Sequence, residues 1–183
     1  MAYPNKIIRN PLTGQDIKFL QTARDTDGAL LEMESTYAGH STEPAPHYHP
    51  QQAEDFTVLS GELSVRVNGE IQLLKAGDSI HIPANTVHGM WNHTDQPVVV
   101  NWQVRPALDT EQLLETGMGL ATDGKTNARG MPGILQVALM ARRFSREFRL
   151  ARPPFWLQKT LFFLLAPFAR LAGYQATYPD YLD

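Results

Sequence analysis

Four residues of types that bind metals fall at fixed intervals between positions 47 and 88, and their spacing constrains the fold more than any other feature. His47 and His49 are two residues apart, Glu54 follows five residues later, and His88 lies 34 residues beyond Glu54. Side chains two residues apart point to the same face of a β-strand, so the two imidazoles can converge on one point. The pattern therefore predicts β-strands that fold over one another and bring Glu54 and His88 to that point.

The chemistry of these four side chains indicates a transition-metal site. The chain contains no cysteine, which excludes thiolate ligands and disulfide bonds. Three neutral imidazoles and one carboxylate form a mixed nitrogen and oxygen site that suits a divalent first-row metal. The histidine pair alone would be equally compatible with solvated loop residues beside Pro50. With the other two ligands, we expect one Fe, Mn, Ni, Cu or Zn ion, bound by His47, His49, Glu54 and His88.

Glycine, proline and asparagine residues surround the four ligands in two groups. Gly61 lies seven residues after Glu54, and a second group reads Gly-x5-Pro-x4-His-x3-Asn from Gly77 to Asn92. The two groups closely resemble the paired motifs of the cupin superfamily, over about residues 15–107. Through this resemblance, the metal-ligand positions of that family fall on His47, His49, Glu54 and His88.

The sequence departs from the cupin pattern at Ser41 and Asn85, where the motifs have glycine. Asparagine tolerates the left-handed backbone that such a turn needs, so the second departure changes little. The resemblance implies an all-β fold, a cupin-type double-stranded β-helix or jelly-roll barrel. It also implies a relation to metal-dependent dioxygenases, isomerases and decarboxylases, and a homodimer formed through strand edges and terminal segments.

The alternation of apolar and polar residues agrees with this fold. Leu31, Met33 and Ser35 alternate with glutamate and threonine, which is typical of a half-buried strand. Asn68-Gly69 predicts a two-residue hairpin turn, because both central positions of a type I′ turn need positive φ. Many short strands at regular spacing, without intervening helices, indicate an all-β barrel or sandwich.

Three large apolar residues are candidates for the wall of a substrate cavity. Phe56 shares a strand face with Glu54, and Met90 shares a face with His88. We therefore expect Phe56 and Met90 inside the barrel near the metal, with Trp102 as a third wall residue. No further acid and base pair has a spacing that marks it as catalytic, so the sequence assigns no catalytic residues.

The pattern changes after Pro106, which divides the chain into two parts. Residues 1–107 are predicted to form a cupin β-barrel domain with an N-terminal arm, irregular over residues 1–14, and residues 108–183 a C-terminal helical extension. In the extension we expect one helix from an Asp109 N-cap, with Gln112 in capping-box position, to about Gly117 or Gly119. Two further helices are expected at residues 134–150 and 155–172.

The extension is basic, and its last helix is apolar nearly all round. Residues 125–183 hold 9 Lys and Arg against 3 Asp and Glu, whereas residues 1–124 hold 7 against 16. The uncharged run 160–169 is too short to span a bilayer, which needs about 20 residues. The extension could cover the barrel or a partner subunit, lie on a membrane surface with its arginines toward phosphates, or form a lid over the cavity. The first alternative predicts that residues 155–172 are at least half-buried against protein.

Three classes of function agree with these features. The first is an enzyme, a metal-dependent oxidoreductase of the dioxygenase type or an isomerase, which acts on a small organic molecule. The second is a cupin that binds a small ligand without turnover, and the third is a membrane-surface or interaction protein that uses the basic helices. The start of the chain has no apolar signal region, which favours the cytoplasm, with a peripheral membrane location as an alternative. No nucleic-acid partner is expected.

Overall fold

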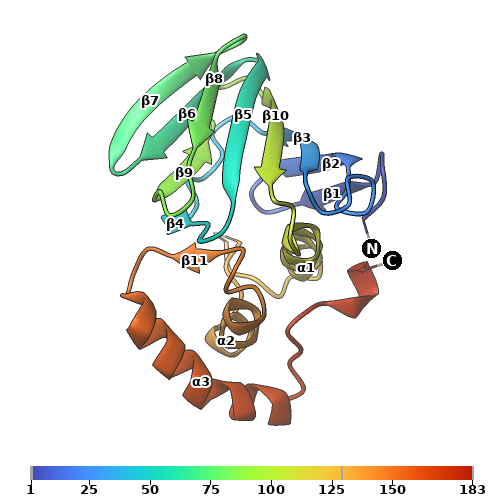
Figure 1. Ribbon diagram of the computed structural model, residues 1–183, viewed down its shortest axis with the longest axis vertical. Coiled ribbons are helices and arrows are strands. Elements are labelled where there is room, and N and C mark those ends of the chain that lie inside the picture. The colour runs from blue at the N-terminus through green and yellow to red at the C-terminus, as the bar shows by residue number, and fades with distance from the viewer. Residues whose placement is uncertain (1, 129, 183) are drawn as a thin grey trace.

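Two antiparallel sheets face each other in the computed structural model, which describes residues 2–128 and 130–182 (Figure 1). The first sheet has the strand order β1-β2-β3-β10-β5-β8, and the second has the order β11-β4-β9-β6-β7. The strands of the first sheet are β1 (Ile7–Asn10), β2 (Gln15–Gln21), β3 (Leu31–Tyr37), β10 (Val98–Arg105), β5 (Ala53–Ser60) and β8 (Ser79–Ile82). Those of the second are β11 (Arg149–Leu150), β4 (His47–Tyr48), β9 (His88–Trp91), β6 (Glu62–Val67) and β7 (Glu70–Lys75).

Period-two burial explains why these segments form strands with one face inward. In β3, Leu31, Met33 and Ser35 are buried while the residues between them are partly exposed. In β5 the buried side chains include Glu54 and Phe56, which therefore share the inner face as predicted. The apolar core between the sheets draws on both of them. Its buried members are Tyr37, Phe56, Val58, Leu63, Val65, Ile82, Met90, Val98 and Val100.

The predicted turns have the predicted backbone conformation. Asn68 and Gly69 have φ of 49° and 94°, as a type I′ hairpin between β6 and β7 requires. Asn85 has φ of 64°, so asparagine supplies the left-handed conformation at this position of the second motif. The prediction of an irregular segment over residues 1–14 was wrong in part, because Ile7–Asn10 pairs with β2 as strand β1.

Helix α1 (Thr110–Thr122) corrects the first prediction for the extension. It continues past Gly117 and Gly119, because Gly119 serves packing rather than termination. A Cβ atom at Gly119 would lie 2.5 Å from the ring of Tyr181, so the close approach of that ring needs glycine. The predicted capping box is also absent, since the Asp109 side chain makes no cap hydrogen bond and instead pairs with Arg143 at 2.8 Å.

Helix α2 (Ile134–Arg143) ends seven residues before the predicted end at residue 150. The chain then turns, and Arg149–Leu150 forms the short strand β11, which pairs with β4. The amide of Ala151 extends this pairing with a 2.8 Å hydrogen bond to the carbonyl of Pro46. The helix therefore ends before the segment in which Arg149 and Leu150 take β4 as a strand partner.

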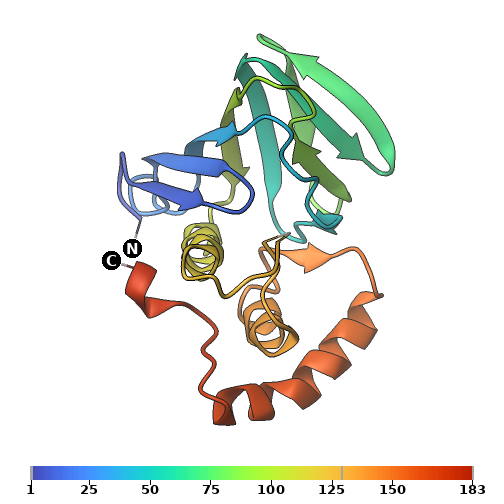
Figure 2. The ribbon, with the colours of Figure 1, turned by 180° about the vertical axis from the view of Figure 1, so that it is seen from behind.

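Helix α3 (Phe155–Leu171) has the predicted bounds to within a residue. In Figures 1 and 2 it lies farthest from the barrel, with α2 between them. With three helices, the chain as a whole is not all-β, although its barrel is. The final turn, η1 (Pro179–Tyr181), returns to α1, so the two ends of the chain lie close together (Figure 2).

A single chain buries only the inner side of α3. The α2–α3 contact contains a small cluster of Leu139, Ala166 and Ala169, and most large apolar side chains of α3 are exposed. The sequence-based expectation that this helix is at least half-buried is therefore not met within one chain, and burial by a partner stays a prediction. The division at residue 107 also stays a prediction. In the part of the chain that the structure describes, no helix is long and apolar enough to cross a bilayer.

Candidate metal centre

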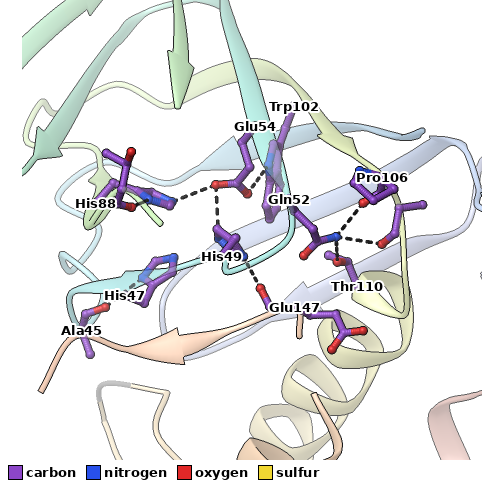
Figure 3. Close-up of polar contacts among 12 residues, drawn as sticks. Ala45, His47, His49, Gln52, Glu54, His88, Trp102, Pro106, Thr110 and Glu147 are labelled. Atoms are coloured by element: carbon purple, nitrogen blue, oxygen red, sulfur yellow. Dashed lines mark hydrogen bonds and ion pairs between the residues drawn. The ribbon is translucent and has the colours of Figure 1, made fainter. Parts of the chain in front are cut away.

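The imidazoles of His47, His49 and His88 come together at one end of the barrel (Figure 3). His47 lies on β4 and His88 on β9, and the two are directly opposite in the register of these antiparallel strands. His49 follows β4 by one residue. One ring nitrogen from each histidine lies within 4.8 Å of the other two, and His49 and His88 are buried. The structure thus assembles the three histidines that the sequence predicted as ligands.

Backbone carbonyls fix the orientation of all three rings. The Nδ1 atoms of His47 and His88 lie 2.9 Å from the carbonyl oxygens of Ala45 and Thr86. His49 Nδ1 contacts the carbonyl oxygen of Glu147 in the same way. A carbonyl oxygen can only accept a hydrogen bond, so each Nδ1 carries the proton. In the neutral rings the lone pair is therefore on Nε2, the nitrogen that faces the centre, as metal-binding histidines require.

Glu54 reaches the same centre from β5. Its Oε2 atom lies 3.2 Å from His49 Nε2 and 2.8 Å from His88 Nε2. Its other oxygen, Oε1, accepts a 2.9 Å hydrogen bond from Trp102 Nε1 (Figure 3). Trp102 therefore binds one oxygen of the carboxylate, and the other oxygen points toward the histidines.

The arrangement of donor atoms fits a cation. Apart from the close contacts that they make with each other and with His88, neither His49 Nε2 nor Glu54 Oε2 has a hydrogen-bond partner in the described residues, and both atoms are buried. Two lone pairs that face each other repel unless a proton or a metal ion lies between them, and unpaired buried polar atoms destabilise the fold. Three Nε2 atoms and one carboxylate oxygen are the donor set that suits a divalent first-row metal. The residues present therefore fit the expected metal.

The ionisation of the ligands agrees with this fit. Burial lowers the pKa of His47 to about 3, and the charges of His88 and His49 add to the effect, so His47 is neutral. Burial would raise the pKa of Glu54, but His49 and His88 outweigh it and hold that pKa below its usual range. Burial would likewise lower the pKa of His49, but the Glu54 carboxylate raises it above its ordinary value. The Glu54 carboxylate and the His49 ring therefore each favour the charged form of the other.

A cavity of about 830 Å³ adjoins the centre, between the barrel and the helical extension. His47, His49 and Trp102 line it from the barrel side. Its other walls come mostly from apolar side chains of the three helices. These include Leu113, Leu114, Met140, Phe144, Phe155 and Phe162.

Two of the three residues predicted for the cavity wall lie elsewhere. Trp102 lines the cavity as predicted, but Phe56 and Met90 lie in the core between the sheets and not on this wall. The Phe56 ring stacks against the Trp102 ring, at 5.5 Å between ring centres. The strand faces were correctly assigned, but the cavity opens toward the helices rather than into the barrel interior.

The sequence did not reveal two contacts that the extension makes with the centre. The Phe148 ring stacks on the His47 ring at 4.8 Å between centres, and the Glu147 carbonyl holds His49. Both residues precede β11, whose pairing with β4 brings them there. Helical periodicity placed Phe148 on the apolar side of the helix predicted over residues 134–150. No signal in the sequence marks a strand of only two residues. The extension thus contacts the site directly, and its role as a cover of the barrel or as a lid stays a prediction.

The remaining histidines lie outside the centre. His81 is 59% exposed and contacts Asp55 Oδ1 at 2.7 Å, so it faces the outer side of its sheet. His93 contacts Ser64 at 2.7 Å.

Comparison with known proteins identifies the family of the barrel. A family model described as "Cupin domain" matches residues 33–104, which include all four predicted ligands. Residues 33–104 are therefore a cupin domain. A solved structure, the crystal structure of a predicted oxalate decarboxylase from Thermotoga maritima, has a TM-score of 0.50 at 19% identity, over 56% of this chain and 92% of that one. At this identity the likeness concerns the fold alone.

Two curated relatives of this cupin are oxidoreductases by name. Quercetin 2,3-dioxygenase from Bacillus subtilis (strain 168) is 32% identical over 78 residues, which are 42% of this chain and 23% of the relative. Oxidoreductase OpS7 from Beauveria bassiana (strain ARSEF 2860) is 30% identical over 90 residues, which are 44% of this chain and 30% of the relative. The matched segments span less than a third of each of these relatives.

Proposed function

We propose that this cupin is a metal-dependent oxidoreductase of the dioxygenase type, which acts on a small organic molecule in the cavity beside the centre. The observation that carries the proposal is the convergence of three imidazoles and a carboxylate, two of which, His47 and His49, line that cavity. The oxidoreductase relatives, one of them named as a dioxygenase, support the same reaction class.

The proposed metal ligands are His47, His49, Glu54 and His88, and four ligands leave room in the coordination sphere for substrate. The metal would supply Lewis-acid and redox chemistry at that open position. The carbonyls of Ala45, Thr86 and Glu147 hold the imidazoles in their ligating orientation. Trp102 holds Glu54 by its Oε1 atom.

The cavity walls favour an apolar, aromatic or aliphatic substrate. A volume of about 830 Å³ lies within the range of about 300–1,000 Å³ that is common for small-molecule sites. The walls carry aromatic and aliphatic side chains from α1, α2 and α3, with His47 and His49 at one end. A substrate would therefore place its one polar, reactive group at the histidines and its apolar body against the helices. In a dioxygenase reaction both atoms of O₂ enter the product and the substrate supplies the electrons, so no separate reductant is needed.

Oxygen uptake and product analysis test the proposal. The protein is purified without chelator, its metal content is measured, and it is incubated with a panel of aromatic and aliphatic alcohols, enols and ketones under ¹⁸O₂. We expect about one redox-active metal per chain and a product that carries both labelled atoms. Chelation or His47→Ala should abolish the reaction, whereas His40→Ala, in an exposed histidine paired with Asp95, should not.

A different outcome would favour the second class of function. If the metal is present at one per chain and panel compounds quench the fluorescence of Trp102, but no compound is converted, the protein is a ligand-binding cupin without turnover. Conversion without uptake of label would identify an isomerase or decarboxylase and would contradict the dioxygenase proposal.

A further inference from the structure

The outer side of α3 exposes more large apolar side chains than any other helix of the described chain. Trp156, Phe163, Phe168 and Leu171 are 69%, 63%, 65% and 86% exposed. Leu157, Leu161 and Leu164 are also exposed, by 40–59%. The inner side of the helix packs on α2 through Phe162, Ala166 and Ala169. This outer face, defined by the seven exposed residues, is covered by no element of the described residues 2–128 and 130–182 (Figures 1 and 2).

The outer face is broad rather than a narrow seam. With 3.6 residues per turn, the arc from Phe163 to Leu161 covers roughly 160° of the helix circumference. Only Thr160 and Pro167, both uncharged, interrupt it. A pair of helices in a coiled coil uses a narrower stripe of two positions per heptad. The breadth of the face fits a flat apolar surface better than a single partner helix.

The charges around the face have one sign. From Arg142 to Gly173 the sequence has seven Lys and Arg residues and one acidic residue, Glu147, which is only 2% exposed. Lys159 and Arg170 lie at the edge of the outer face, beside Phe163. The Arg142 guanidinium lies 5.2 Å from the Phe163 ring. An apolar face with a cationic border and exposed Trp and Phe side chains is typical of helices that lie in a membrane interface.

Charge complementarity indicates which kind of partner covers the outer face of α3. A second copy of this surface would bring cations against cations, which opposes association. Anionic lipid headgroups would instead pair with the cationic border while the acyl region accepts the apolar side chains. The helix lies along the surface rather than across it, because its 17 residues extend only about 25 Å at ~1.5 Å per residue.

We propose that α3 docks on the surface of an anionic lipid membrane through its outer face. Trp156 and Phe163 belong both to the outer face and to the wall of the cavity. The docked helix therefore places one side of the cavity at the lipid boundary. An apolar ligand dissolved in the membrane would reach the cavity without crossing water.

Vesicle flotation of the full-length protein tests this proposal. We expect at least tenfold more binding to vesicles of phosphatidylcholine with phosphatidylglycerol than to phosphatidylcholine alone, and a loss of this preference at high salt. The double variant Leu164→Gln with Phe168→Gln should lower binding to the anionic vesicles at least tenfold. Both side chains are exposed, so the variant should keep its fold, which its melting temperature checks.

A matched control is available on the barrel. Ile71 and Leu73 on β7 are each 53% exposed, so Ile71→Gln with Leu73→Gln removes a similar apolar area far from α3 and should leave binding unchanged. Lys159→Gln with Arg170→Gln should reduce the preference for anionic lipid. The proposal is overturned if the α3 variant binds like the unchanged protein, or if the unchanged protein binds neither vesicle. It is also overturned if light scattering shows a dimer that the α3 variant dissociates, since a second copy would then be the occupant.

Discussion

In the barrel, large apolar side chains of both sheets point inward, whereas on α3 most of them point to solvent. Phe56, Val58, Leu63 and Val65 are at most 2% exposed, and together they close the space between the sheets. On α3, Phe162 is the one large apolar residue that is buried. The two sheets thus bury these side chains against each other, while α3 has a second apolar face that the described chain leaves exposed.

The polar groups of the two regions differ in the same way. In the barrel, His49, Glu54 and His88 are buried and face one another, which is unfavourable without a cation. Around α3, the arginines and Lys159 are at the surface. The difference matches the two proposals made above, an enclosed site for a metal and a small molecule, and an exposed face for a lipid surface.

Removal of a ligand should have the largest effect on the enclosed site. His88→Ala removes one imidazole and leaves Glu54 with one fewer partner. We expect affinity for the metal to fall by more than the ~10–100-fold that loss of an outer hydrogen-bond partner causes. Elemental analysis after gel filtration measures this loss. His81→Ala, in the exposed histidine that contacts Asp55, is the control, and equal metal content in the two variants would exclude His88 as a ligand.

Matched substitutions on the two faces of α3 test whether its inner side is buried by protein and its outer face is not. Phe162→Ala removes a buried ring and should lower the free energy of unfolding by about 3 kcal/mol. Phe168→Ala removes an equal ring from the outer face and should change it by no more than about 0.5 kcal/mol. Chemical denaturation without lipid measures both values. A large loss in Phe168→Ala would show that protein already covers the outer face.

Loss of the Trp102 hydrogen bond should weaken the metal site less than loss of a ligand. Trp102→Phe keeps an aromatic ring against Phe56 but removes the donor to Glu54 Oε1. We expect metal affinity to fall about 10–100-fold, since partners of ligating groups contribute on this scale. Competition with a chelator measures the affinity. An unchanged affinity would mean that Glu54 is oriented by other contacts or is not a ligand.

Metal affinity should also depend on pH through His49. Burial lowers the pKa of His49, but the Glu54 carboxylate outweighs burial and raises it above its ordinary value. A metal must displace the proton of protonated His49 before it can bind there. The affinity for the metal should therefore fall about tenfold per pH unit below the pKa of His49 and level off above it. His47 adds no such dependence near neutral pH, because its pKa is about 3. Titration of a colourless metal such as Zn²⁺ at several pH values checks the slope, and a flat profile through pH 6 would contradict it.

The strands were predictable because their signals are local. Alternate burial in β3 and the Asn68-Gly69 turn follow from residues two apart or adjacent. The convergence of His47, His49, Glu54 and His88 was predictable as well, since the four residues occur in motifs with fixed spacing. The sequence therefore supplied the barrel and the identity of the side chains at its centre.

The contacts between the extension and the site were not predictable, because they join residues far apart in sequence. Strand β11 forms only where β4 is available as a partner. That pairing carries Phe148 to His47 and the Glu147 carbonyl to His49. The exposure of α3 was missed for a related reason. An apolar helix predicts burial, but periodicity does not tell whether protein or lipid covers it.

An anomalous diffraction measurement on crystals of the protein, purified without chelator, tests the central claim most directly. The absorption edge identifies the metal, and the peak gives its position. We expect one peak about 2.0–2.2 Å from the Nε2 atoms of His47, His49 and His88, with Glu54 Oε2 as the fourth protein ligand. A peak bound by other residues, or full metal content in chelator-treated crystals of the His88→Ala variant, would contradict the account.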